Sequence, residues 1–167
     1  MPEKYIPEHI DPYRFSEQNL HLDGLVKLAD MPRLNPTVGM DNDCVQVKMH
    51  FGVDEQGINY IKGHLETKLK LQCQRCMEPY LYEIMSDFML GIVSSLDEAK
   101  ALPELYEPAL TKDGSLALRE LIEDEIILNL PIIPRHELEN CNVKLPYRDA
   151  EWEETKNPFA VLKVLKK

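Results

Sequence analysis

The fold of this chain is decided by residues 60–73, YIKGHLETKLKLQC. Ile61, Leu65, Leu69 and Leu71 alternate there with polar side chains, many of them charged. Apolar residues at alternate positions are typical of a strand that faces a core on one side and water on the other. The stretch therefore predicts a long, half-buried strand.

The same alternation continues on both sides of this stretch. It covers residues 20–28 and 45–51 before it and residues 80–90 after it. Residues 54–57, DEQG, are typical of a turn. Strands joined by short turns pair as antiparallel neighbours. We therefore expect an antiparallel sheet of long hairpins in the first half of the chain.

The second half of the chain changes to helical spacing. Residues 95–102 predict a short helix with Ser95 as its N-cap. Residues 116–130 predict the main helix, which we expect to start at an N-cap on Ser115 and to end before Pro131. Strands followed by helices indicate an α+β domain in which the main helix packs on the sheet.

We expect a single domain over residues 1–167, because a chain of this length can bury a core without disulfides. Asn157 and Pro158 predict the N-cap and first residue of a short C-terminal helix. The expected parts are an N-terminal segment, a β-rich half, a helical part, an irregular acidic segment and the C-terminal helix. These parts cover residues 1–19, 20–93, 94–130, 131–156 and 157–167.

The chain is acidic, with 19 Lys plus Arg against 29 Asp plus Glu and a formal net charge of −10. Residues 97–154 hold 6 basic and 15 acidic side chains, whereas residues 155–167 hold 4 basic side chains and no acidic one. Non-specific binding to nucleic acid depends on Lys and Arg, so the composition excludes a generic nucleic-acid coat. It also argues against a peripheral protein of anionic membranes.

The sequence carries no targeting signal that we recognise. No stretch approaches the roughly 18 apolar residues of a transmembrane helix. The first residues, MPEKY, lack the basic region and apolar run of a secretory signal. The 4 cysteines do not resemble a secreted disulfide framework. We expect a cytoplasmic protein with reduced thiols and no contact with a membrane.

Cys73 and Cys76 form a Cys-x-x-Cys motif at the expected tip between two long strands. Two thiolates at this spacing can bind one metal ion, and His136 and Cys141 offer the other two ligands of a Cys3His set. The sequence therefore suggests a structural zinc ion. The alternative is that these cysteines are small apolar residues at a hairpin end. A thioredoxin-type dithiol fits poorly, because that motif opens a helix in a βαβ unit. Cys44 stands apart and is expected in the core.

Three surfaces are candidates for contact with RNA or a partner protein. A tyrosine beside basic residues on the sheet is typical of surfaces that stack single-stranded bases. Carboxylates on the main helix suit a basic partner, although their simpler interpretation is a solvated face. The C-terminal segment adds a basic tail. In this order, the residues are Tyr60, Lys62, Lys68, Lys70 and Arg75, then Glu120, Glu123 and Asp124, then Lys163, Lys166 and Lys167.

The sequence offers little for catalysis. It has no Gly-x-Ser-x-Gly motif and no glycine-rich phosphate-binding loop. A nuclease would need several carboxylates around Mg²⁺. The consecutive carboxylates of residues 123–125 cannot all point to one site from a helix. We therefore expect no enzymatic activity.

Several motifs occur in order along the chain from about residue 22 to the end. They are Leu71-x-Cys73-Gln74-Arg75-Cys76, Ala101-Leu102-Pro103-Glu104-x-Tyr106-Glu107-Pro108, Glu123-Asp124-Glu125-Ile126-Ile127-Leu128-x-Leu130-Pro131, His136-x-x-x-x-Cys141 and Asn157-Pro158-Phe159-Ala160-Val161-Leu162. An earlier Asp11-Pro12-x-Arg14 also fits. In combination these motifs resemble the YceD family, whose members are described as large ribosomal RNA subunit accumulation proteins.

The resemblance implies a role in the synthesis, processing or stability of 23S rRNA, and it carries over no catalytic residue. Some relatives have a further pair of Cys-x-x-Cys-like elements after the main helix, where this chain has only His136 and Cys141. We expect a non-enzymatic ribosome-biogenesis factor that binds a large-subunit ribosomal protein or a pre-ribosomal particle. The alternatives are a protein that binds rRNA directly through the sheet and an rRNA-processing nuclease.

Overall fold

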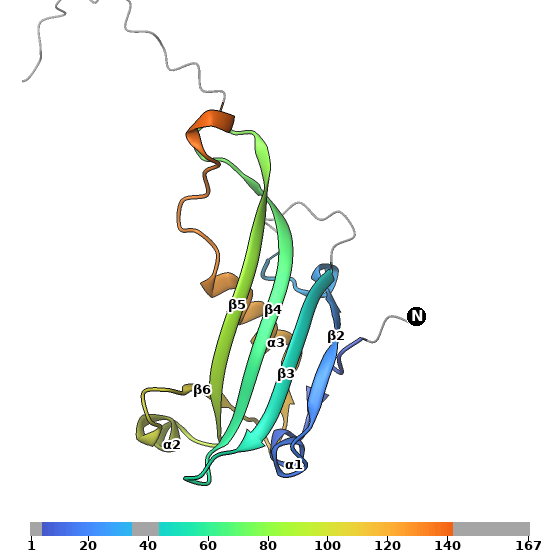
Figure 1. Cartoon of the computed structure of the whole chain (residues 1–167), viewed down its shortest axis with the longest axis vertical. Helices are drawn as coiled ribbons and strands as arrows, with labels where there is room; N and C mark the ends of the chain where they lie inside the picture. The colour runs from blue at the N-terminus through green and yellow to red at the C-terminus, as the bar shows by residue number, and fades with distance from the viewer. Residues whose placement is uncertain (1–4, 35–43, 142–167) are drawn as a thin grey trace, which may run out of the picture.

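The computed structural model describes residues 5–34 and 44–141 (Figure 1). Its main feature is a five-stranded sheet in the order β2-β3-β4-β5-β6. Neighbours from β2 to β5 are antiparallel, as predicted, whereas β6 is parallel to β5. The α+β class is therefore confirmed, with a mixed sheet. The strands are β2 (His21–Lys27), β3 (Cys44–Val53), β4 (Asn59–Gln72), β5 (Pro79–Val93) and β6 (Glu107–Leu110).

Strand β4 shows how the alternation builds the sheet. Ile61, Leu65 and Leu69 are fully buried on its inner side, and Lys62, His64, Glu66 and Lys68 at the intervening alternate positions face outward. Gly63 also lies on the inner side, directly opposite Phe88 of β5. A Cβ atom at Gly63 would lie 2.0 Å from Cζ of Phe88. The phenylalanine ring therefore fills the space over this glycine, and any larger residue would displace it.

Two helices contribute to the core on the inner side of the sheet. Helix α3 (Leu118–Leu128) lies behind the sheet in Figure 1, and it buries Ile122 and Ile126 completely. Helix α1 (Pro12–Glu17) lies at the lower end, where the ring of Phe15 is 5.2 Å from that of Phe51. These contacts place the core between the sheet and its inner helices.

The short helix α2 (Leu96–Ala101) follows β5 and begins as the sequence predicts. Its N-cap is Ser95, whose side chain accepts a hydrogen bond of 3.3 Å from the Glu98 amide. The Glu98 carboxylate in turn accepts a hydrogen bond of 2.7 Å from the amide of Ser94. Reciprocal bonds of this kind satisfy amides at the helix start that have no partner within the helix.

The main helix begins later than predicted. Residues 116–117 form β7 (Leu116–Ala117), which pairs with β1 (His9–Ile10), and Ala117 takes the N-cap position. The Ser115 hydroxyl instead donates a hydrogen bond of 3.4 Å to the carbonyl of Ile10. The prediction of Ser115 as N-cap is therefore wrong, because pairing with a distant N-terminal strand keeps the first predicted turn extended.

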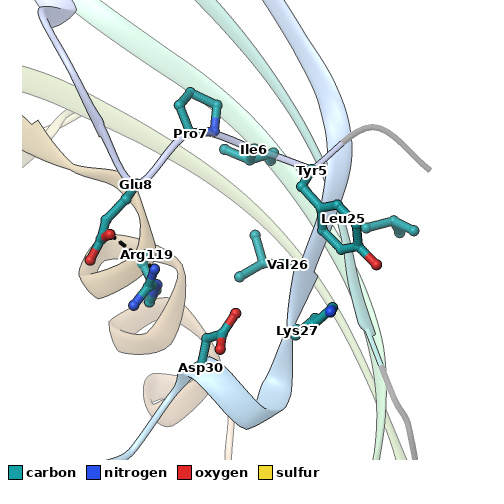
Figure 2. A pocket seen from close by; sticks show the side chains of 9 residues that line it. All are labelled: Tyr5, Ile6, Pro7, Glu8, Leu25, Val26, Lys27, Asp30 and Arg119. Carbon is teal, nitrogen blue, oxygen red and sulfur yellow. Dashed lines mark ion pairs between the residues drawn. The ribbon is translucent and has the colours of Figure 1, made fainter. Parts of the chain in front are cut away.

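The N-terminal residues 5–8 connect β2 to α3 (Figure 2). The amide of Ile6 donates a hydrogen bond of 3.2 Å to the carbonyl of Leu25, and the amide of Leu118 donates one of 2.9 Å to the carbonyl of Glu8. The Glu8 carboxylate also pairs with Arg119 at 3.1 Å. A pocket of about 210 Å³ lies beside this segment. The segment thus fixes the start of α3 relative to the sheet edge.

The β4–β5 hairpin is longer than the rest of the sheet. Strand β3 pairs with β4 only as far as Glu66, whereas β5 pairs with β4 up to Gln72. Residues 67–84 therefore form a two-stranded extension, which we call the arm; it rises above the sheet in Figure 1. An isolated two-stranded ribbon is marginally stable in water, so the arm needs further support.

Residues 131–141 provide neighbours for the arm and contain one short 3-10 turn, η2 (Leu138–Asn140). The remainder of the predicted irregular segment and the predicted C-terminal helix at 157–167 lie outside the described residues. Among the helices that are described, none is long and apolar enough to cross a membrane.

Candidate metal centre

The turn at the tip of the arm places two thiols close together. The amide of Cys73 donates a hydrogen bond of 2.9 Å to the carbonyl of Glu78, and the amide of Met77 donates one of 2.8 Å to the carbonyl of Cys73. Met77 has a positive φ of 63°, which lets the chain reverse within the turn. Cys73 and Cys76 consequently face a common centre.

Residues 131–141 return along the arm and reach this turn (Figure 1). The amide of Gln74 donates a hydrogen bond of 2.9 Å to the carbonyl of Pro134. The Arg75 guanidinium donates to the carbonyl of His136 at 3.1 Å and to Sγ of Cys141 at 2.8 Å. Main-chain and side-chain bonds thus fix the second segment against the first.

The structure brings together the four residues that the sequence predicts as metal ligands. Sγ of Cys73 lies 4.0 Å from Sγ of Cys141, and Sγ of Cys76 lies 3.6 Å from Nε2 of His136. One ligand atom from each residue lies within 4.8 Å of the other three. The pairs are 68 and 60 residues apart in sequence, so only the fold unites them.

These separations fit a tetrahedral metal ion. With metal–sulfur and metal–nitrogen bonds of about 2.3 and 2.0 Å, the edges of the tetrahedron are about 3.8 Å between sulfurs and about 3.6 Å from sulfur to nitrogen. The observed 4.0 and 3.6 Å are close to those edges. The group could therefore hold a metal ion after small inward shifts of its side chains.

The surroundings shift the pKa values of the two thiols of the turn in opposite directions. Burial by itself raises the pKa of Cys73, but hydrogen bonds from the amides of Cys76, Arg75 and His136 outweigh burial and lower the pKa to about 6. Burial and the neighbouring thiols raise the pKa of Cys76. A bound cation would stabilise the thiolate form of both sulfurs.

The composition of the centre is typical of a structural site. All four coordination positions would be filled by protein atoms, whereas catalytic zinc sites keep one position open for water or substrate. Cys73 is fully buried, and the ring of Tyr80 lies 5.5 Å from that of His136. The chemistry that this arrangement supports is therefore cross-linking of the arm to residues 131–141.

The residues predicted to contact RNA on the sheet occupy two places. Tyr60 and the three lysines of β4 share its outer side, opposite the core. Lys68 pairs there with Glu83 at 2.5 Å, so the face is mixed in charge. Arg75 lies at the tip of the arm, where its guanidinium holds Cys141. The lysines concerned are Lys62, Lys68 and Lys70.

The acidic residues that the sequence predicts as a contact surface on the main helix differ in their exposure. Glu120 and Asp124 are exposed, but Glu123 is only 3 % exposed. Its two carboxylate oxygens accept hydrogen bonds from the amide of Arg33 at 2.6 Å and from the Arg33 Nε at 2.9 Å. The interpretation of a solvated helix face is therefore wrong for Glu123, because an arginine from a distant segment neutralises it.

Sequence reasoning missed Arg33. It also donates from its guanidinium to Asp124 at 2.5 Å and to the carbonyl of Glu120 at 3.1 Å. Arg33 follows Pro32 in a segment without periodicity, and 90 residues separate it from Glu123. No local signal in the sequence could have paired them.

Cys44 and the C-terminal lysines are also assigned positions from the sequence. Cys44 is half-buried and lies on the opposite side of β3 from the buried Val45, so its expected place in the core is wrong. Lys163, Lys166 and Lys167 lie outside the described residues.

The fold and the centre define an α+β protein whose sheet carries a protruding arm with a closed Cys3His group at its tip. A family model described as "Large ribosomal RNA subunit accumulation protein YceD" matches residues 61–166. A Haemophilus influenzae protein named "Large ribosomal RNA subunit accumulation protein YceD" is 34% identical over 167 residues, covering 96% of each chain. The chain belongs to the YceD family. No solved structure matches it at a significant level.

Proposed function

We propose that this protein is a non-enzymatic factor that supports the accumulation of large-subunit rRNA by binding a basic ribosomal protein or a pre-ribosomal particle. The observation that carries the proposal is membership of a family described by large ribosomal RNA subunit accumulation. The acidic balance of the chain favours a basic partner, because opposite charges speed encounter and select against wrong partners.

The tip of the arm holds a zinc ion in this proposal, and the ion has a structural role. Three sulfurs and one imidazole nitrogen are a ligand set that structural zinc sites use. The ion joins the tip of a marginal two-stranded ribbon to residues 131–141. The arm then presents a fixed surface to the particle.

The direct test is deletion of the gene in its native host with measurement of 23S rRNA against 16S rRNA. We expect a deficit of 23S rRNA and of large subunits that the wild-type gene corrects. Purification of the tagged protein from cells lysed at low salt should recover a basic large-subunit protein or a large-subunit precursor. Normal rRNA levels together with recovery of neither would overturn the proposal.

A second candidate function is direct binding of rRNA by the outer side of β4. The observation in its favour is that Tyr60 and three exposed lysines share that side. Replacing Lys62 and Lys70 by Glu would then weaken binding of a 23S rRNA fragment and lower the slope of its salt dependence by at most about one unit per lost phosphate contact. An absence of measurable affinity for rRNA at low salt would exclude this candidate.

A further inference from the structure

A groove of about 750 Å³ lies between α3 and the β6–β7 region. Its volume is in the range of about 300–1,000 Å³ that is usual for ligand sites. Leucines from four elements, β5, β6, β7 and α3, line it beside carboxylates, and Lys112 and His9 contribute to it as well. The residues that matter here are Glu107, Leu110, Glu120, Asp124, Glu125 and Leu128. The groove therefore combines apolar surface with negative charge.

Glu125 is the unusual residue of this groove. It is only 8 % exposed, and in the described part of the chain its carboxylate takes part in no hydrogen bond or ion pair. Burial is the largest influence that raises its pKa, and the neighbouring charges of Glu107 and Asp124 raise it further. A carboxylate in this position loses part of its hydration without gaining a partner within the described chain, which is unfavourable for folding.

Glu123 on the same helix shows what is missing. It is buried to a similar degree, but Arg33 supplies a cation and two hydrogen bonds. Neither Lys112 nor His9 forms an ion pair with Glu125, although both line the groove. Within the described chain, Glu125 therefore has no paired cation, whereas Glu123 on the same helix is paired with Arg33.

We propose that this groove binds a basic, amphipathic segment of a partner protein. A lysine or arginine of that segment places its charged group against Glu125, Glu107 and Asp124, and an adjacent apolar side chain rests on Leu110 and Leu128. The two leucines are 46 and 74 % exposed, so the surface is open to such a segment. The carboxylates repel RNA. A simple divalent cation has no apolar part that could pack on the leucines.

The inference rests on the proposed function, because it assumes that the segment belongs to a ribosomal protein. It deepens that function by assigning the contact to the groove rather than to the arm or the outer side of the sheet. A basic segment is suited to the groove because its methylene stem covers apolar surface while its charged end reaches the carboxylates. A guanidinium can also bridge two carboxylates through its fork of N–H donors.

The test is photocrosslinking in cells with p-benzoylphenylalanine at Leu128 of the full chain. Leu105, which is 67 % exposed and does not line the groove, is the matched control position. We expect a crosslink at Leu128 whose peptide, identified by mass spectrometry, belongs to a large-subunit protein and carries Lys or Arg beside an apolar residue. The control position should not yield that peptide.

Charge variants make the test specific. Glu125→Gln keeps the shape of the side chain, and we expect it to reduce the Leu128 crosslink about tenfold, because a charge-assisted hydrogen bond is lost. Glu107→Gln is a second variant; because Glu107 is exposed, we expect its replacement to leave the fold intact. Glu55→Gln in the β3–β4 turn removes the same charge away from the groove and should leave the yield unchanged.

The outcomes separate the groove from the proposed function. Crosslinks to residues 156–167 of this chain, to a second copy, to RNA or to an acidic peptide would overturn the inference, and so would the absence of any crosslink. Recovery of a ribosomal protein by the whole protein, with no effect of either glutamate variant, would overturn the groove alone. A basic segment from a protein outside the ribosome would overturn the proposed function alone.

Discussion

The tip of the arm and the groove beside α3 both gather ionisable side chains, but they gather them differently. At the tip, four ligand atoms from two segments lie within 4.8 Å of one another. In the groove, Glu125 lies beside other carboxylates, and no cation of the described chain pairs with it. On our proposals a single ion completes the first site, and a side chain of another protein completes the second.

The two buried glutamates of α3 show the same difference at smaller scale. Arg33 neutralises Glu123 through paired hydrogen bonds, whereas no basic side chain of the described chain pairs with Glu125, and the charges of Glu107 and Asp124 raise its pKa. Burying a charge is unfavourable unless a partner compensates it. An uncompensated carboxylate in an open groove lowers the stability of the free protein, and binding of a cationic partner would restore that stability.

Removing a ligand from the tip is expected to have the largest effect. Cys73→Ser should abolish binding of about one zinc ion per chain. Residues 67–84 should then lose protection from hydrogen exchange, because a two-stranded ribbon is marginal without support. Metal analysis of untagged protein and exchange measured by mass spectrometry check both results. Cys44→Ser is the control and should keep the metal; a metal-free wild type would contradict the prediction.

Breaking the compensated pair on α3 should have the next largest effect. Arg33→Ala leaves Glu123 buried without a cation, and we expect the free energy of unfolding in urea to fall by about 2–3 kcal/mol. The value is below that of a fully buried pair, because Arg33 is 46% exposed. Arg119→Ala breaks the more exposed pair with Glu8 and should cost less than about 1 kcal/mol. Equal losses in the two variants would refute this ranking.

For the uncompensated carboxylate of Glu125 we expect the opposite result, namely a substitution that increases stability. Glu125→Gln should raise the free energy of unfolding at neutral pH by about 1 kcal/mol, because an amide loses less than an unpaired carboxylate on burial. Burial and the charges of Glu107 and Asp124 raise the pKa of Glu125 in the folded state. Denaturation curves for the variant and wild type measure the difference.

The pH dependence of that difference follows from the direction of the shift. A carboxyl whose pKa is higher in the folded state binds more protons when folded, so stability falls as pH rises above the unfolded value of about 4.3. The fall ends above the folded pKa of Glu125. The stabilisation by Glu125→Gln should therefore be absent at acidic pH and complete at neutral pH; a difference that does not vary with pH would contradict the explanation.

The smallest effect is expected from the histidines on the outer side of the sheet, whose pKa values the neighbouring side chains shift. His64 lies 3.0 Å from Glu66 and 2.7 Å from Asp87, and hydrogen bonds to these carboxylates raise its pKa. Burial, and then the charges of His21 and Lys62, lower the pKa of His50. NMR titration should place His64 above and His50 below the ordinary value of about 6.5.

The exposed position of His64 limits its effect on stability. A histidine with a raised pKa stabilises the fold below about pH 6.5, and this contribution is lost as pH rises through the folded pKa. Water screens the pair, so His64→Gln should change the free energy of unfolding by at most about 0.5 kcal/mol at pH 5. A larger change would mean that exposed pairs on this face resemble the buried pair on α3.

Several elements were predictable because their signals are local. The alternation in residues 60–73 predicted β4, and Ser95 predicted the start of α2. Ser115 misled the prediction of α3, because the pairing of β7 with β1 is decided by residues more than a hundred positions away. The parallel strand β6 had no local signal either, since its direction follows from how the chain crosses after β5.

The sequence by itself determined the antiparallel strands, the α+β class, the acidic balance and the residue types of the Cys3His set. These features depend on spacing and composition, which a linear chain displays directly. Only the tertiary structure decided that Cys73 meets Cys141 across 68 residues, that Arg33 neutralises Glu123 and that Glu125 has no such partner. Such encounters depend on packing between distant segments, and packing is a property of the whole fold.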